Sequence, residues 1–491
     1  MFEVAELKNK VSKAEYETEM SVIREQLLDV QQKLEAAAVP VLIVIAGVDS
    51  AGKGDLIGKL NEWLDPRFMR THAFGYPSDE EQERPPHWRY WMSLPPRGRV
   101  AIYAMGWYGQ VLSDRLNERI GNGKLEKELS HINKLEKELS EDGALIIKFW
   151  LHLSKKQQQK VVAKLDENPE TRWRVTAVEK RHLKLYDKFV SICEQVIRHT
   201  STPEAPWIVI NGYDAYYRRL TSARHIIQRC GLRMETLPAI VPAAIGESIA
   251  HVKSGVSLLS SLDLDKKLEK SDYQEKLAQH QGTISRLSHK ARQRKKSALL
   301  LFEGWDAAGK GGVIRRITQA MDARNYRVIP IAAPTDEEKS HHYLWRFWRQ
   351  LPRDGKVTIY DRSWYGRVLV ERVEKLASTA EWLRAYSEIN DFEEELTEHG
   401  IILLKFWMHI DKDEQLSRFK QREDTAYKRY KITADDYRNR EKWDEYESAV
   451  NEMITRTSTE YAPWHLIEGN DKYYARIRAL AELCKAYEKA L

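Results

Sequence analysis

The stretch that decides the fold is GWDAAGKG, which runs from Gly304 to Gly311. It follows an apolar run, Ala298–Phe302, and precedes a segment, Gly312–Met321, that is expected to be a helix. When a strand, a glycine-rich loop and a helix follow in this order, backbone N–H groups and the lysine surround phosphate oxygens. The sequence therefore predicts a phosphate-binding P-loop. The residues expected to line the phosphate are Gly304, Ala308, Gly309, Gly311 and Gly312.

The same loop occurs a second time, as GVDSAGKG at Gly47–Gly54, again after an apolar run, Val41–Ile45. The two loop lysines, Lys53 and Lys310, lie 257 residues apart, and this offset holds for about 200 residues without an insertion. It also aligns Trp107–Gly109 with Trp364–Gly366, Lys148–Trp150 with Lys405–Trp407, and Thr200–Thr202 with Thr457–Thr459. The chain is therefore expected to contain a duplicated domain, with copy one at 1–234, a linker at 235–257 and copy two at 258–491.

In copy two, further strands are expected at 326–332, 356–360, 401–409 and 465–468. Helices are expected between them, one of them opened by the capping box Thr335–Glu338 and carrying residues 341–350. Alternating strands and helices predict an α/β fold, in which each copy is a parallel sheet flanked by helices. Ligands are expected at the carboxyl ends of the strands.

Composition narrows the class of protein. The chain has 491 residues, 42% of them hydrophobic and 31% charged, so each copy can bury a core. A net charge of +6 is too mild to favour nucleic acid, although it allows local basic clefts. Three scattered cysteines fit a reducing compartment, and no apolar run has the length of a membrane span. We expect a cytoplasmic protein with no nucleic-acid or membrane partner.

The P-loop of copy two departs from the usual pattern because Gly311 occupies the position where Ser or Thr normally binds Mg²⁺. Asp306 lies inside the loop, where a carboxylate next to phosphate is unfavourable unless a divalent cation bridges the two. Asp306 is therefore a candidate metal ligand, or positions the acceptor oxygen. The alternative is an Asx turn that only stabilises the loop.

A second carboxylate, Asp361, ends the strand 356–360 and is followed by Arg362. This arrangement is typical of a Walker B site, in which the carboxylate holds Mg²⁺ and the arginine contacts the migrating phosphoryl group. An ordinary ion pair at the end of a strand is the alternative.

A basic run follows the strand 401–409, within the helical stretch 414–431. It is either a solvated helix face or a mobile lid whose arginines close on phosphates. Its basic residues are Arg418, Lys420, Arg422, Lys428, Arg429 and Lys431.

Copy one lacks most of these charges, although it retains Asp49, Lys53 and Arg89. Packing alone would not explain why copy one lost these particular charges. Copy one is therefore expected to be a degenerate, structural domain. The charges lost from copy one, each given with its replacement there, are Asp361 (Ala104), Arg362 (Met105), Arg349 (Met92), Arg367 (Gln110), Arg418 (Val161), Arg422 (Leu165) and Lys472 (Ala215). Copy one also gains a negative charge, because Asp55 stands where copy two has Gly312.

The loop Gly304–Gly312, the motif Tyr360–Tyr365, and Thr457–Thr459 with Ala462–Trp464 resemble the polyphosphate kinase type 2 family. The tandem arrangement resembles the family's two-domain polyphosphate:AMP phosphotransferases. The resemblance implies transfer of a phosphoryl group from inorganic polyphosphate to AMP, giving ADP, on a thymidylate kinase-like fold with a helical lid. It also implies Mg²⁺ as cofactor, with Mn²⁺ as an alternative. Because single-domain relatives associate, the chain is expected to form a homo-oligomer built on an internal pseudo-dimer.

Residue by residue, the resemblance implies that Asp306, Lys310, Asp361, Arg362 and a lid arginine are catalytic, with Asp306 and Asp361 as metal ligands. Arg422 is the expected lid arginine, and Arg418 is expected to bind phosphate. Two other functions stay open: an ATP-dependent nucleoside monophosphate kinase, and a polyphosphate-binding protein without catalysis.

Overall fold

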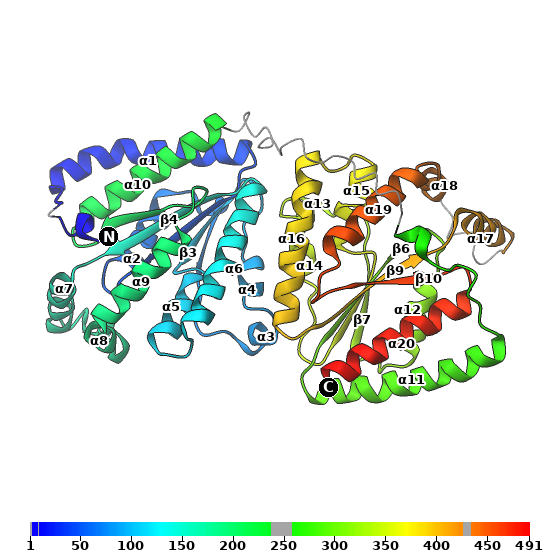
Figure 1. The fold of residues 1–491 in the computed structure, drawn as a ribbon. Coiled ribbons are helices and arrows are strands. Elements are labelled where there is room, and N and C mark those ends of the chain that lie inside the picture. Colours follow the sequence, from blue (N-terminus) through cyan, green and yellow to red (C-terminus); the bar gives the residue numbers. More distant parts are fainter. Residues whose placement is uncertain (1, 8, 237–257, 426–433) are drawn as a thin grey trace. The chain divides into compact units, whose positions relative to one another are not determined.

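The computed structural model describes residues 2–7, 9–236, 258–425 and 434–491. The chain forms two compact units, each an α/β sheet covered by helices (Figure 1). One unit is built on copy one and includes residues 335–342, and the other is built on copy two and includes residues 78–88. The expected boundaries 1–234, 235–257 and 258–491 stay a prediction, and most of the expected linker lies outside the described residues.

Each copy contains one sheet of five parallel strands. The order of strands is β2-β3-β1-β4-β5 in copy one and β7-β8-β6-β9-β10 in copy two. The strands are β1 (Val41–Gly47), β2 (Met69–Ala73), β3 (Val100–Ala104), β4 (Leu145–His152), β5 (Trp207–Asn211), β6 (Ala298–Gly304), β7 (Tyr326–Pro330), β8 (Val357–Asp361), β9 (Ile402–His409) and β10 (Trp464–Glu468). The parallel α/β fold predicted for both copies is confirmed.

Helices cover both faces of each sheet (Figure 1). In copy one they are α1 (Lys13–Ala36), α2 (Lys53–Trp63), α3 (Asp79–Gln82), α4 (Trp88–Trp91), α5 (Tyr108–Leu116), α6 (Asn122–Glu141), α7 (Lys155–Glu167), α8 (Ala177–Lys184), α9 (Tyr186–Thr200) and α10 (Ala215–Thr236). In copy two they are α11 (Lys270–Gln293), α12 (Lys310–Gln319), α13 (Asp336–Lys339), α14 (Trp345–Trp348), α15 (Val370–Val373), α16 (Thr379–Glu398), α17 (Lys412–Asp424), α18 (Ala434–Glu441), α19 (Trp443–Thr457) and α20 (Lys472–Ala490). In copy two, α11, α12 and α20 pack together, as do α15, α16 and α19.

The strand that leads into each P-loop lies in the centre of its sheet, and the strand pairing repeats with the same offset as the sequence. Val41 pairs with Val100 and Leu145, and Ala298 pairs with Val357 and Ile402. All residues of β1 and all but the last of β6 are buried, as expected for a central parallel strand. The P-loop of each copy therefore emerges at the middle of the carboxyl edge of the sheet.

One expected helix is divided in the structure. The capping box at Thr335 is confirmed, but the helix it opens, α13, ends at Lys339, and α14 begins only at Trp345. The hydroxyl of Ser340 donates to the carbonyl of Glu337 at 2.7 Å, a side-chain bond that competes with the helical ladder. Copy one holds Pro85 and Pro86 at the equivalent break, where proline cannot continue a helix.

A buried polar network explains why several aromatic motifs repeat in both copies. In copy two, Lys405 Nζ donates to Glu393 (2.7 Å), to the Tyr365 hydroxyl (3.0 Å) and to the Thr457 carbonyl (2.6 Å). In copy one, Lys148 makes the same bonds to Glu136 (2.6 Å), Tyr108 (3.1 Å) and Thr200 (2.6 Å). Burial lowers the pKa of both lysines and raises the pKa of both glutamates. These motifs therefore join strand, helix and loop in each sheet.

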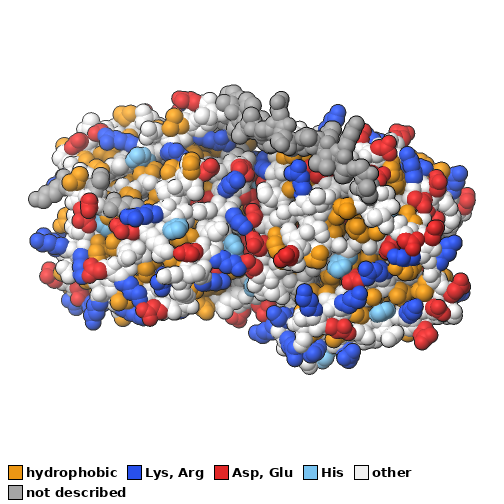
Figure 2. All heavy atoms as spheres, in the orientation of Figure 1, with side chains coloured by type: hydrophobic (Ala, Val, Ile, Leu, Met, Phe, Trp, Pro, Cys, Tyr) orange, Lys and Arg blue, Asp and Glu red, His pale blue; other side chains and the backbone are white. Residues whose placement is uncertain are grey.

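The surface carries both signs of charge. Figure 2 shows lysine and arginine side chains largely interspersed with acidic ones on the visible face. Cys193, Cys230 and Cys484 are free and buried. Within the described part of the chain, every helix is too short or too polar to span a bilayer.

Candidate active site

The P-loop of copy two is shaped by two glycines. Gly304 has φ 143°, and a Cβ atom there would collide with the backbone oxygen of Met408 on β9. Gly309 caps α12 in the left-handed conformation at φ 108°. Lys310 begins α12, and its Nζ donates to the carbonyls of Gly304 at 2.7 Å and Trp305 at 3.2 Å. The lysine thus folds over the loop, with its charge at the helix N-terminus.

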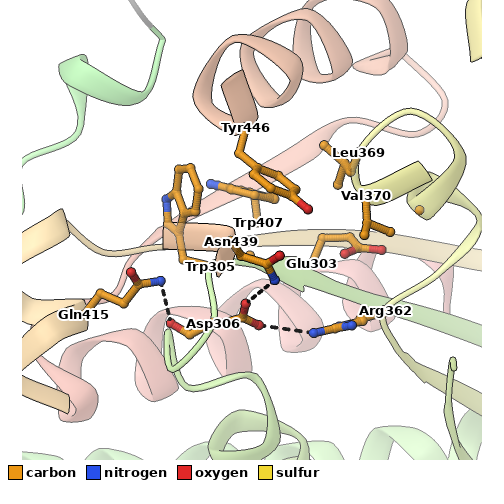
Figure 3. Close-up of a pocket in the computed structure, with 12 residues that line it drawn as sticks. Glu303, Trp305, Asp306, Arg362, Leu369, Val370, Trp407, Gln415, Asn439 and Tyr446 are labelled. Atoms are coloured by element: carbon orange, nitrogen blue, oxygen red, sulfur yellow. Dashed lines mark hydrogen bonds and ion pairs between the residues drawn. The ribbon is translucent and has the colours of Figure 1, made fainter. Parts of the chain in front are cut away.

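Asp306 holds the centre of the site (Figure 3). One carboxylate oxygen accepts from Arg362 at 3.1 Å and the other from Asn439 of α18 at 3.0 Å. Its backbone oxygen accepts from Gln415 of α17 at 3.2 Å. The side chain is only 15% exposed. Asp306 therefore ties the P-loop to the end of β8 and to two helices that follow β9, which is more than an Asx turn does.

Asp361 and Arg362 lie at the carboxyl end of β8, beside the P-loop. Arg362 has φ 65°, and its N–H donates to Phe302 on β6 at 3.0 Å. Burial works to lower the pKa of Arg362, but the charges of Asp306, Glu303 and Asp361 outweigh it and raise the pKa. Arg362 therefore stays a cation at the edge of the phosphate loop.

A cleft of about 1250 Å³, open to solvent, brings most of the expected site residues together, and we name it the phosphate cleft. Loop residues Asp306–Gly312 form one wall, with Asp361 and Arg362 beside them. Its basic side chains are Lys310, Arg315, Arg316, Arg362 and Arg422. These five cations outnumber the three carboxylates of the cleft, Asp306, Asp361 and Asp436, so the cleft suits a ligand with several negative charges.

Arg418 and Arg422, both on α17, occupy different places. Arg418 is buried, and its guanidinium donates to the carbonyls of Ala307 (3.0 Å) and Ala308 (3.1 Å), and to those of Gly469 (2.6 Å) and Asn470 (2.9 Å). It therefore supports the P-loop from behind. Arg422 is half-buried and lines the phosphate cleft, so the geometry favours Arg422 for contact with phosphate. Lys428, Arg429 and Lys431 lie outside the described residues.

A second, more apolar pocket adjoins Asp306 and Arg362 (Figure 3). Its walls include Trp305, Trp407, Tyr446 and Leu369, and it opens to solvent. Trp305 stacks on Trp443 with ring centroids 3.8 Å apart and 10° between the planes. An aromatic pocket next to a polyanion cleft suits a ligand that has both a flat ring and a phosphate.

Sequence reasoning missed Glu303, which lies on β6 just before the P-loop. Its side chain is 5% exposed and accepts from the Ser363 hydroxyl at 2.7 Å. Burial raises the pKa of Glu303, while Ser363, Lys310 and Arg362 oppose that rise. A comparison of the two copies could have identified Glu303 from the sequence, because copy one has Ala46 and Gly106 at the positions of Glu303 and Ser363. This pair is lost from copy one together with Asp361 and Arg362, whereas the buried lysine network is kept.

Copy one keeps the shape of the loop without the cleft's charges. Lys53 Nζ donates to the carbonyls of Gly47 and Val48, both at 2.8 Å. Asp49 contacts Nδ1 of His182 at 2.6 Å, and His182 stands where copy two has Asn439. Burial works to raise the pKa of Asp49, but His182 and Lys53 outweigh it and lower the pKa.

The carboxylates of copy two fit a divalent cation. Asp306 and Asp361 line the same cleft, and carboxylate oxygens are the ligands that Mg²⁺ prefers. Copy one has Asp49 but only Ala104 opposite it, so this donor set is incomplete there.

A central P-loop strand, a carboxylate at the end of its neighbour, and a cleft rich in arginine define a P-loop kinase-like protein. The chain belongs to the polyphosphate kinase 2 family, whose model matches residues 10–236 and 267–491. Members of this family generally depend on a divalent metal.

Similarity to individual proteins extends over the whole chain. A Pseudomonas aeruginosa protein named polyphosphate:AMP phosphotransferase is 47% identical over 491 residues, covering 100% of this chain and 99% of that one. One of the same name from Acinetobacter johnsonii is 35% identical and covers 96% of both chains. A crystal structure described as a polyphosphate kinase 2 from Pseudomonas aeruginosa PA01 superposes with a TM-score of 0.90 at 46% identity, covering 100% of this chain and 99% of that one.

Proposed function

We propose that the chain transfers the terminal phosphoryl group of inorganic polyphosphate to AMP, giving ADP. The observation that carries this proposal is the cleft of copy two, which combines a P-loop, two carboxylates and several arginines next to an aromatic pocket. Full-length similarity to proteins named polyphosphate:AMP phosphotransferase supports the donor and the acceptor.

Both substrates are anions, so the chain's main task is to neutralise charge and align the reacting groups. Lys310 and the loop N–H groups hold the donor phosphates. Arg362, with Arg422 from α17, contacts the transferring group. The aromatic pocket holds the nucleoside of AMP, which directs its phosphate toward Asp306 and Arg362.

Asp306 and Asp361 would hold Mg²⁺, with Mn²⁺ as the alternative. When bound, the ion would supply positive charge that neutralises phosphate oxygens. Arg362 bonds to Asp306 and keeps that carboxylate turned toward the cleft.

Copy one acts as a structural partner with little or no activity of its own. Its loop is intact, but Ala104, Met105 and Leu165 stand where copy two has Asp361, Arg362 and Arg422. We also propose a cytoplasmic location, because three free thiols fit a reducing compartment.

The test is ADP formation from AMP with long-chain polyphosphate and Mg²⁺, comparing the unchanged chain with Lys310→Ala and its matched control Lys53→Ala. Lys310→Ala should lower the rate on the order of 10²-fold or more, because it removes a charge that holds the donor. Lys53→Ala should retain most of the rate. Activity with ATP but none with polyphosphate would refute the donor, and binding without turnover would refute catalysis.

A further inference from the structure

Helix α7 of copy one carries three lysines on its outer face, and we name them the lysine row. Lys156, Lys160 and Lys164 follow one another at intervals of four residues, about 6 Å along the helix axis, and all three are exposed. Gln158 and Val162, on the other face of the helix, are buried. The lysine row therefore points to solvent, away from the P-loop of copy one.

The lysine row is unfavourable for the helix that carries it. Like charges four residues apart on a helix repel one another, and among the described residues no carboxylate pairs with any of these three lysines. Other lysines nearby are compensated, since Lys155 pairs with Asp187 and Lys180 pairs with Asp166. The three charges of the row therefore weaken α7 unless an anion binds to them.

The equivalent helix of copy two, α17, allows a direct comparison because both helices contact their loops in the same way. Gln158 of α7 donates to the carbonyl of Asp49 at 3.1 Å, and Gln415 of α17 donates to the carbonyl of Asp306 at 3.2 Å. The inner and outer faces of the two helices therefore correspond residue by residue.

Positive charge lies on opposite faces of these two helices. On the outer face, the positions of the lysine row are occupied in copy two by Asp413, Ser417 and Gln421. On the inner face, Arg418 and Arg422 of copy two correspond to Val161 and Leu165 of copy one. Loss of the site explains the apolar inner face of α7, but it does not explain three additional lysines on the side that faces solvent.

Helix α8 extends this basic surface. It packs against α7 (Figure 1), and Lys180 of α8 contacts Asp166 of α7 at 3.2 Å. Arg181 and Lys184 of α8 are exposed. Residues 155–188 contain ten lysines and arginines against five acidic residues, whereas the equivalent residues 412–445 of copy two contain ten against nine. An excess of positive charge on this scale attracts a polyanion.

The surface fits a polymer of phosphates that carries no bases. Proteins that bind single-stranded nucleic acid stack the bases on aromatic side chains, and the lysine row contains none. Trp173, between the two helices, is 72% exposed, but its N–H donates to the carbonyl of Glu170 at 2.9 Å and the guanidinium of Arg174 lies 5.3 Å from its ring. Lysine contacts phosphate as a point charge, without a preferred orientation.

We infer that the lysine row, together with α8, is a docking surface on copy one for the distal part of a long polyphosphate chain whose end reacts at copy two. This inference rests on the proposed function and gives copy one a role in it. Docking makes the second contact intramolecular and raises the local concentration of the donor at the active site. The surface uses neither Lys53 nor the P-loop of copy one. Its contacts are exposed charges, so docking is weaker and more sensitive to salt than binding at the active site.

The test compares long-chain with short-chain polyphosphate as donors for the full chain. The row variant combines Lys156→Gln, Lys160→Gln and Lys164→Gln, which removes three charges and keeps good helix-forming side chains. Its KM for long-chain polyphosphate should rise about 10-fold at low salt, because three exposed contacts with phosphate are lost together, and this rise should shrink as salt is added. The KM for short-chain polyphosphate, the KM for AMP and kcat should not change, because a short donor cannot reach both surfaces.

The matched control removes the same net charge from other exposed positions of copy one. It combines Lys13→Gln, Lys33→Gln and Lys137→Gln on α1 and α6, where each lysine pairs with a carboxylate one helical turn away. Its KM for long-chain polyphosphate should equal that of the unchanged chain. An equal rise of this KM in the control and in the row variant would show that net charge, and not the lysine row, sets the affinity.

The outcomes distinguish the docking surface from the proposed function. An unchanged KM for long-chain polyphosphate in the row variant, with an active parent chain, would overturn the docking surface and leave the proposed function intact. A parent chain that does not use polyphosphate would overturn both. A KM that rises equally for long and short donors would also overturn docking. Isothermal titration in which the row variant loses affinity for single-stranded RNA but not for long-chain polyphosphate would assign the surface to nucleic acid instead.

Discussion

At the residue scale, Glu303 is a buried carboxyl group whose burial is unfavourable for folding, which points to a role in the site. Its carboxyl is buried between Ser363 and the charges of Lys310 and Arg362, and burial raises its pKa. A buried carboxylate is unfavourable for stability unless it is fully compensated. Copy one, which keeps the framework, has Ala46 at this position. We interpret Glu303 as a positioning residue that balances the two cations.

Glu303→Gln should therefore make the protein more stable and less active. Because the folded pKa lies above the ordinary value, the folded state binds the proton more tightly, and the free energy of unfolding falls as pH rises between the two values. Gln keeps an acceptor for Ser363 and abolishes this fall. Denaturant unfolding at several pH values measures it, with kcat followed alongside.

The matched control is Glu62→Gln, whose partner Lys59 lies on an exposed turn of α2 in copy one. It should change neither kcat nor the slope of stability against pH between the ordinary and the raised pKa of Glu303. If Glu303→Gln keeps full kcat, or loses stability at neutral pH, the role assigned to Glu303 is wrong.

At the scale of elements, the two copies show which contacts build the sheet and which serve the site. The network around Lys405 recurs in copy one around Lys148 with nearly equal distances. In contrast, the segment that follows β8 in copy two differs in structure from the segment that follows β3 in copy one. Copy one forms the continuous helix α5, whereas copy two forms a short 3-10 turn, Trp364–Arg367, before α15. Ser363 caps that turn by accepting from the N–H of Tyr365, and Gly106 offers no such cap.

Lys405→Met and Lys148→Met should each destabilise their own unit by about 3–5 kcal/mol, because each leaves a buried glutamate without its partner. The exposed pair Lys33–Asp29 provides the control, and Lys33→Met should cost less than about 1 kcal/mol. Thermal unfolding of the three variants tests this. Equal effects for Lys405→Met and Lys33→Met would contradict a structural role for the network.

At the scale of the whole molecule, duplication has produced two similar sheets with unequal sites. One retains a P-loop with a full set of charges, and the other retains the loop with an internal ion pair at its helix N-terminus. Although the chain has two P-loops, we therefore expect one strong binding site for the polyphosphate donor per chain. The expected homo-oligomer built on an internal pseudo-dimer stays a prediction.

Titration of the full chain with long-chain polyphosphate in the Asp361→Asn background, which should suppress turnover, should give one strong site per chain. Lys310→Ala should remove it and Lys53→Ala should not, because only copy two has Arg362 and Arg422 beside its loop, where copy one has Met105 and Leu165. Two sites of equal affinity, each abolished by one of these substitutions, would show that copy one binds the donor as well as copy two.

The sequence by itself determined the duplication, the order of strands and helices, and the two loops, because these depend on local patterns that repeat at one offset. Comparing the copies also selected Asp361, Arg362 and Arg422, since a lost charge is visible without a structure. Only the tertiary structure separated Arg418, which supports the loop from behind, from Arg422, which lines the cleft. Only the structure brought Glu303 and Asn439 to the loop, because these residues are distant in sequence or hidden within a strand. Which side chains meet depends on how strands and helices pack, and the spacing of residues along the chain does not contain that information.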